Sequence, residues 1–218
     1  MSTSIIAPPA STRLTTATNA RGDLGLPATA PTDAQLERWI DQASAQASTF
    51  CRRVFGRATY RERFDLANRC RDDLYLGLLL DAGPVVSIQA VAVDGLLLSP
   101  ATYEVDDRLL YRLQDGDRRA FHGRVVAVEY VAGWVLPSEA DDYANPPVGA
   151  EKLPADVERA VIQLVGGPAF GLGRDPMVKS DDVEGVGSRS FYVQGAGASL
   201  PHPEAEATLS QYRRLAFA

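Results

Sequence analysis

Apolar side chains recur every three or four residues after Pro31, and this period predicts an amphipathic helix over about 34–55. Thr32 and Gln35 match a capping box at its start, in which each side chain bonds the backbone N–H of the other residue. Gly56 is a natural stop. The apolar stripe consists of Leu36, Trp39, Ile40, Ala43, Ala47, Phe50 and Val54.

The period changes to two from Thr59 onward, which is typical of strands that bury one face. Gly83-Pro84 and Asp94-Gly95 are turn signals between these segments. A β-meander of this kind needs a cover, and the long helix is the expected one. The predicted strands lie at about 59–64, 74–80, 85–93, 102–105, 109–113 and 125–131, the last being the strongest.

A second apolar stripe begins after Pro154, where a missing N–H is tolerated, and predicts a second long helix. Gly166-Gly167-Pro168 interrupts this stripe, so we expect a kink or a break before Phe170. A last helix is predicted over 203–216, with Arg213 and Arg214 near its end. The stripe of the second helix contains Val157, Ala160, Val161 and Leu164.

These patterns predict an α+β fold, with a long N-terminal helix and further helices packed with a small antiparallel β-meander. Residues 1–30 contain few large apolar side chains and are expected to form a flexible arm. One domain is expected over 31–173, followed by an extended arm over 174–201 and a C-terminal helix over 202–218. The arm has no helical period, but Ser190, Phe191, Tyr192 and Val193 form a short β-prone island in it.

Composition narrows the function classes. The 218 residues carry a formal net charge of −6, whereas proteins that grip nucleic acid are usually basic. Twenty of the 22 basic residues are arginines, which reflects either a GC-rich genome or interfaces built on bidentate guanidinium pairs. No signal peptide and no apolar run long enough to span a bilayer is visible, and Cys51 and Cys70 form no redox or metal motif. We therefore expect a protein of a reducing cytoplasm, with no membrane partner.

Candidate catalytic groups are sparse. Four aspartate pairs could bind a cation or divide acid and base roles, but adjacent residues on an extended segment point in opposite directions. His122 and His202 lie in no zinc motif, and the glycines of 166–173 follow a helical stripe and lack the Lys-Ser/Thr of a phosphate loop. We predict no catalytic residue, metal or cofactor. The aspartate pairs are Asp72-Asp73, Asp106-Asp107, Asp141-Asp142 and Asp181-Asp182.

Several short motifs occur in a distinctive order, and this order resembles the head–tail connector (adaptor) proteins of siphophage-type tailed bacteriophages. The resemblance covers roughly 31–216. The segments that carry it are the Ala-rich helix 40–47, the strand and Pro turn 78–88, Tyr130-Val-Ala-Gly-Trp134, Leu153-Pro-Ala-Asp-Val157, the acidic segment 180–185, and Tyr212-Arg-Arg214. Two features depart from the family: the Gly-Gly-Pro interruption and a longer strand region.

The resemblance implies a structural, non-enzymatic subunit of the virion neck, assembled in the bacterial host cytoplasm. It implies a ring of twelve copies beneath the portal protein and above a stopper or tail-completion protein, with DNA passing through the lumen without specific binding. Phage, prophage and gene-transfer particle are equally compatible with it. The implied contact residues are Ser190, Phe191, Tyr192 and Val193 of an assembly arm, and Leu209, Tyr212, Arg213, Arg214 and Leu215 of the C-terminal helix.

Two alternatives remain open. The first is a metal-dependent or hydrolytic enzyme, which would need a pocket that joins carboxylates with His122 or His202. The second is a DNA-binding assembly factor, against which the acidic balance argues.

Overall fold

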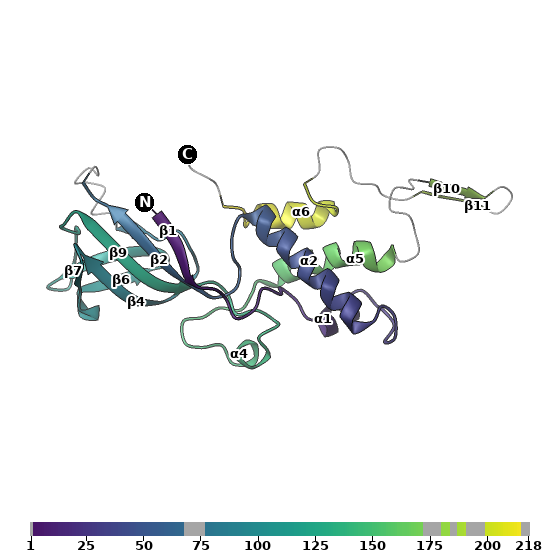
Figure 1. The fold of residues 1–218 in the computed structure, drawn as a ribbon, viewed down its shortest axis with the longest axis horizontal. Coiled ribbons are helices and arrows are strands. Elements are labelled where there is room, and N and C mark those ends of the chain that lie inside the picture. Colours follow the sequence, from purple (N-terminus) through teal and green to yellow (C-terminus); the bar gives the residue numbers. More distant parts are fainter. Residues whose placement is uncertain (1, 68–76, 172–179, 184–186, 191–198, 215–218) are drawn as a thin grey trace. The chain divides into compact units, whose positions relative to one another are not determined.

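A computed structural model describes residues 2–67, 77–171, 180–183, 187–190 and 199–214 (Figure 1). The chain forms two compact units, and each is discontinuous in sequence. The strand unit comprises Met1–Ser11 and Val54–Lys152, and the helical unit comprises Thr12–Arg53 and Leu153–Ala218. The α+β class is thereby confirmed. The continuous domain predicted over 31–173 is instead divided between the two units.

The strand unit contains an antiparallel five-stranded sheet in the order β1-β2-β9-β4-β5 (Figure 1). Along β2, Tyr60 and Phe64 are buried and Arg61 and Arg63 are exposed, as the period of two predicts. Tyr60 pairs with Tyr130 of β9, and their rings stack with centroids 5.6 Å apart. The strands are β1 (Ser2–Ala7), β2 (Ala58–Asp65), β4 (Val85–Val93), β5 (Leu96–Leu97) and β9 (Val125–Ala132).

A second antiparallel sheet covers the core that the long helix was expected to cover. Leu78, Leu80 and Leu110, which lie on or beside its strands, are fully buried in one cluster with Val128 and Tyr130 of the first sheet. The sequence period identified the buried face but not its partner. This sheet comprises β3 (Leu78–Leu79), β6 (Tyr103–Asp106), β7 (Leu109–Gln114) and β8 (Asp117–Arg119). The strand unit also contains a 3₁₀ turn at Pro100–Thr102 and the short helix α4 (Ala140–Ala144).

The turn between β4 and β5 is the Asp-Gly turn that the sequence predicts. Asp94 and Gly95 both have positive φ angles, 48° and 86°, which suits the right-handed twist of a two-residue hairpin. The Asp94 carboxylate accepts hydrogen bonds from the backbone N–H groups of Arg124 (3.0 Å) and Val125 (2.9 Å). The hairpin is therefore bound to the start of the neighbouring strand β9.

The helical unit is built around α2 (Asp33–Cys51), which packs on α5 (Ala155–Phe170) and α6 (Pro203–Ser210). The predicted capping box is confirmed, because Thr32 accepts from the N–H of Gln35 and the Gln35 side chain accepts from the N–H of Thr32. Of the predicted stripe, Leu36, Ile40, Ala43 and Ala47 are buried, and Trp39 and Phe50 are half-buried. Val54 lies beyond the helix, which ends at Cys51 and not at about residue 55 as predicted. The unit also holds α1 (Ala17–Asp23) and a hairpin of β10 (Ser180–Val183) and β11 (Gly187–Ser190).

The N-terminal thirty residues differ from the prediction of a flexible arm. Residues of β1 pair with β2, and farther along Leu14 and Ala20 are buried in the helical unit. Pairing with a strand more than fifty residues away supplies backbone hydrogen bonds that the composition does not reveal.

The second helix, α5, continues through Pro168 to Phe170, so the predicted break is absent. Pro168 lies in the last turn, with only two helical residues after it, and the N–H of Gly171 donates to the Gly167 carbonyl at 3.0 Å. The last helix is shorter than predicted and ends at Ser210.

Candidate functional site

The C-terminal helix was predicted to present an interface, and the structure divides the residues named for it. Leu209 is fully buried, and its carbonyl accepts a hydrogen bond from the Cys51 thiol at 3.3 Å. Tyr212 donates its hydroxyl to the Asp156 carboxylate at 2.8 Å. Leu209 thus belongs to the core of the helical unit. Leu215 lies outside the described residues.

The predicted arm contact lies largely outside the structure as described. Ser190 is the last residue of β11, and Phe191, Tyr192 and Val193 are outside the described residues. The hairpin of β10 and β11 does place one end of the β-prone island on a strand.

Four arginines gather at the C-terminal end of α2. Arg52 caps the helix in a left-handed conformation, and Arg53 follows it. The N–H of Arg214 donates to the Cys51 carbonyl at 3.0 Å, and the guanidinium of Arg213 lies 5.4 Å from the centre of the Phe50 ring. Arg52 and Arg213 are exposed, whereas Arg53 and Arg214 are half-buried. Cations at a helix C-terminus complement its dipole, and an exposed guanidinium group suits carboxylates or phosphates.

This arginine cluster joins residues that are about 160 positions apart, and the sequence reasoning missed it. The sequence pattern places Arg213 and Arg214 near the end of the last helix and carries no sign that Arg52 and Arg53 lie beside them. Within the described part of the chain, Arg52 and Arg213 form no ion pair with a carboxylate. The cluster is therefore basic on a chain whose net charge is −6.

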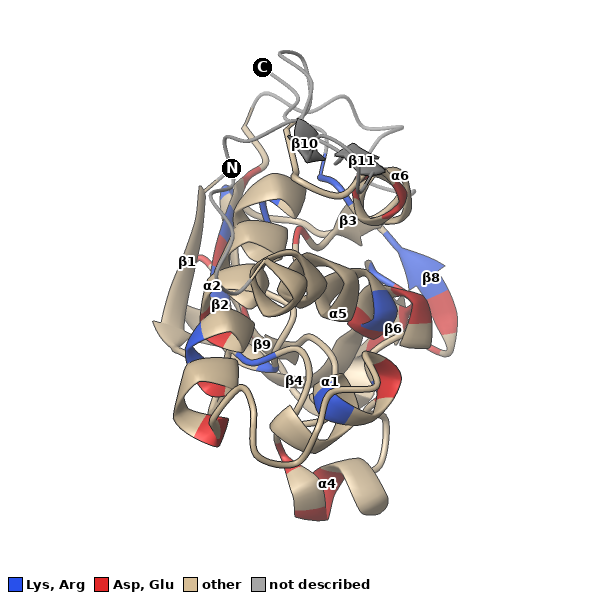
Figure 2. Ribbon diagram, turned by 90° about the vertical axis from the view of Figure 1, so that its right-hand side faces the viewer, with Lys and Arg blue, Asp and Glu red and all other residues tan. Residues whose placement is uncertain are grey.

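Several charged residues of the strand unit, by contrast, are paired locally. Strand β8 carries acidic and basic residues next to each other (Figure 2). Its Arg118 contacts Glu104 at 2.5 Å and Asp106 at 3.2 Å, and the guanidinium lies over the Tyr111 ring. Arg57 pairs with Asp142 of α4 and with Glu139. These contacts hold loops of the strand unit in place.

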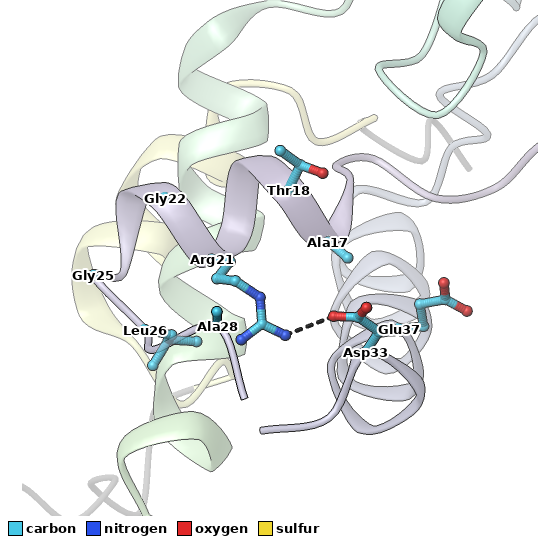
Figure 3. A pocket seen from close by; sticks show the side chains of 9 residues that line it. All are labelled: Ala17, Thr18, Arg21, Gly22, Gly25, Leu26, Ala28, Asp33 and Glu37. Atoms are coloured by element: carbon cyan, nitrogen blue, oxygen red, sulfur yellow. Dashed lines mark hydrogen bonds and ion pairs between the residues drawn. The ribbon is translucent and has the colours of Figure 1, made fainter. Parts of the chain in front are cut away.

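A groove of about 720 Å³ lies beside α1 and the start of α2 (Figure 3). Its central cation, Arg21, is used internally: the guanidinium donates to the carbonyls of Pro27 and Pro31 and to Asp33 at 2.7 Å. Glu37 at the rim pairs with Arg13 at 3.3 Å. The polar groups of this groove therefore fix the loop between the two helices. The lining residues are Ala17, Thr18, Arg21, Gly22, Gly25, Leu26, Ala28, Asp33 and Glu37.

The candidate catalytic residues have structural settings. His202 is the N-cap of α6 and its Nδ1 accepts from the N–H of Ala205 at 3.4 Å, and His122 lies exposed in a connection before β9. Asp107 occupies a left-handed turn position. Among the described residues, no three His, Cys, Asp or Glu side chains are grouped to hold a metal ion, and no helix is long and apolar enough to cross a membrane. Asp72-Asp73 and Cys70 lie outside the described residues.

Two buried groups have shifted pKa values without a catalytic arrangement. Burial raises the pKa of the Cys51 thiol to about 11, which keeps it protonated and unreactive at neutral pH. Burial also raises the pKa of the Glu62 carboxyl, against the hydrogen bonds donated by the Asp81 N–H (2.9 Å) and the Thr3 hydroxyl (3.0 Å). The second oxygen of Glu62 has no hydrogen-bond partner.

Comparison with known proteins gives matches among solved structures. No family model matches the sequence, and no curated protein is significantly similar to it. Solved structures do match over the full length, at 16% identity, covering 100% of this chain and 98% of theirs. They include chains from the neck of an empty gene transfer agent (GTA) particle (TM-score 0.54), the virion of a native GTA particle (0.55) and the neck of a native GTA particle (0.52). The chain therefore shares the fold of proteins from these particles.

Proposed function

We propose that this chain is a structural subunit of the neck of a phage-like particle, a head–tail connector that joins the DNA-filled capsid to the tail. The observation that carries the proposal is the likeness over the whole chain to proteins of GTA necks. The order of the motifs supports the same role.

The subunits form a ring, of twelve copies by the resemblance, and DNA passes through its lumen without specific binding. The acidic balance of the chain supports this, because an excess of carboxylates gives few counterion-releasing contacts to phosphate. A ring needs heterologous interfaces, in which two different patches of one subunit meet. Assembly takes place in the cytoplasm of the host bacterium.

The arginine cluster at the end of α2 is the surface that we assign to a neighbouring virion protein. Tyr212, Arg213 and Arg214 belong to the predicted C-terminal interface, and Arg52 and Arg53 enlarge it. Planar guanidinium groups bind carboxylates in a bidentate manner, so an acidic face of the portal protein is the expected partner. Arg52→Glu with Arg213→Glu should abolish binding to the portal protein in a pull-down, whereas Arg118→Glu, which lies on β8, should leave it intact.

The arm over 174–201 is the contact that we assign to the stopper or tail-completion protein. Its β10–β11 hairpin, with the island that begins at Ser190, could extend a partner's sheet by strand addition. Deleting 180–195 should leave the fold intact and stop particle completion. An unchanged infectious or gene-transfer titre would refute the assignment of the arm.

The direct test of the proposed function is cryo-electron microscopy of the necks of particles from the strain that encodes this chain. Density that fits both units, in a ring between portal and tail, would establish the connector role and give the number of copies. A neck accounted for entirely by other chains would remove it.

A further inference from the structure

The β4–β5 hairpin ends in an exposed apolar pair. Leu96 and Leu97 are 76% and 75% exposed, and they form the whole of β5, the outermost strand on one side of the five-stranded sheet. A single leucine at this exposure is ordinary, but two consecutive exposed leucines on an edge strand favour pairing with a strand of another molecule.

The hairpin is rigid before it meets any partner. Its tip is fixed by the two hydrogen bonds from Arg124 and Val125 to the Asp94 carboxylate. The same end of the hairpin is closely packed, since a Cβ placed on Gly123 would lie 2.5 Å from a methyl carbon of Val93 and 2.8 Å from a carboxylate oxygen of Asp94. A preorganised segment loses little conformational entropy when it binds, which favours affinity.

The opposite edge of the same sheet has matching properties. Strand β1 pairs only with β2, all six of its residues are exposed, and Ile5 and Ile6 are 46% and 44% exposed. Edge strands in natural proteins often carry charges or proline against unwanted pairing, yet neither β1 nor β5 contains any. The edges are limited by shape instead, since β5 is only two residues long and the register of β1 shifts between Ile5 and Ala7.

We propose that copies of this chain associate edge to edge, the β4–β5 hairpin of one copy docking on strand β1 of the next. Consecutive residues of a regular strand point to opposite faces, so β5 offers one leucine on each face. Pairing then brings Leu96 and Leu97 beside Ile5 and Ile6, which lie at the register shift of β1, while backbone groups on the outer sides of the two strands bond across the junction.

The occupant is a second copy because one molecule cannot join its own edges. Three strands separate β1 from β5, which puts the edges about 19 Å apart at the usual strand spacing. A contact between two different patches is heterologous, and repetition closes into a ring when the rotation permits. This inference rests on the ring of the proposed function and names the surfaces that build it.

The test uses the full-length chain and sedimentation velocity over a wide concentration range. Leu96→Ser with Leu97→Ser, and Ile5→Ser with Ile6→Ser, should each weaken self-association roughly 100-fold, from the loss of two buried apolar side chains. Val148→Ser is the matched control, since Val148 is fully exposed on a loop of the same unit and should behave as wild type. Circular dichroism verifies that each variant is folded.

Mixing the two double variants separates this contact from others. The Ile5, Ile6 variant retains an intact hairpin and the Leu96, Leu97 variant retains an intact β1 edge. The mixture should therefore form a one-to-one heterodimer and nothing larger. A hairpin that paired with another hairpin would leave the Ile5, Ile6 variant associating as wild type, and that result would overturn the proposal. Wild-type protein that stays monomeric throughout the range would overturn it as well.

A cross-link covers the case in which the serine variants lose stability. Ile6→Cys with Leu97→Cys, in a background with Cys70→Ser, should give a ladder of oligomers on oxidation, and Ile6→Cys with Val148→Cys should not. Equal ladders from both pairs would refute the contact. If the wild-type chain is found in particle necks but the serine variants also assemble into necks normally, the edge-to-edge contact is refuted and the connector role stands. If the wild-type chain is absent from necks, the connector role itself is refuted.

Discussion

Replacing Leu209 by alanine distinguishes a core residue from an interface residue. The sequence assigns Leu209 to a partner surface, whereas the structure leaves it 0% exposed between α6 and the rest of the helical unit. Because Leu209 is buried, the substitution should destabilise the isolated chain. If Leu209 served an interface instead, the substitution would leave the free energy of unfolding of the isolated chain almost unchanged.

The magnitude follows from three deleted carbon atoms. At about 0.8 kcal/mol each, their transfer from the core accounts for roughly 2.4 kcal/mol, and the cavity they leave adds to it, for a total of about 3 kcal/mol. In a chain of this length each kcal/mol lowers the melting temperature by roughly 2–4 °C, so a decrease of about 6–12 °C is expected.

Urea denaturation followed by tryptophan fluorescence is the assay, because each unit holds one tryptophan. Trp39 lies on α2, and Trp134 packs against Phe55 in the strand unit with ring centroids 5.7 Å apart. In a Trp134→Phe background, Trp39 reports the helical unit alone. Leu97→Ala is the matched control, the same substitution at an exposed leucine, and should change the free energy of unfolding by less than about 0.5 kcal/mol. A Leu209→Ala variant as stable as this control would refute the reasoning.

Three further predictions concern groups with clear structural causes. Glu62→Gln removes a buried carboxyl whose pKa is raised in the folded chain. Protonated Glu62 contributes its full stability below pH about 4.5, and this contribution is lost as pH rises past the raised pKa, so the Gln variant should gain stability relative to wild type as pH rises. Parallel urea-stability profiles of the two proteins from pH 4 to 8 would contradict this. Cys51, with a pKa of about 11, should resist iodoacetamide at pH 7.5 in the folded chain and react in urea, as measured by peptide mass spectrometry. Thr32→Ala breaks the capping box and should cost about 1 kcal/mol in urea denaturation, while Thr18→Ala at the exposed groove should cost less; equal values would argue against the cap.

Features decided by neighbours in sequence were predictable. The capping box at Thr32, the Asp94-Gly95 turn and the alternation along β2 and β9 depend on interactions within a few residues or on a period that the chain displays directly. The same signals identify many of the buried residues of α2 and α5, and they predict the α+β class that the structure has.

Features decided by distant pairing were not predictable. Strand β1 has a weak apolar pattern and exists because β2 offers hydrogen bonds to its backbone, and the cover of the main sheet is a second sheet whose short strands have little period of their own. Leu209 has the same chemistry whether it faces a partner or a core, and only the packing of α6 on α2 places it inside.

The candidate interaction surfaces also consist of residues that the sequence identified and residues that only the tertiary structure brought together. Sequence alone named Arg213 and Arg214 from a motif at the end of the chain. The tertiary structure brought them to Arg52 and Arg53, and it placed Leu96, Leu97, Ile5 and Ile6 on the two edges of one sheet. Periodicity reports which face of an element is buried, but an interface is a meeting of elements, and their positions are determined by packing and hydrogen bonding across the whole chain.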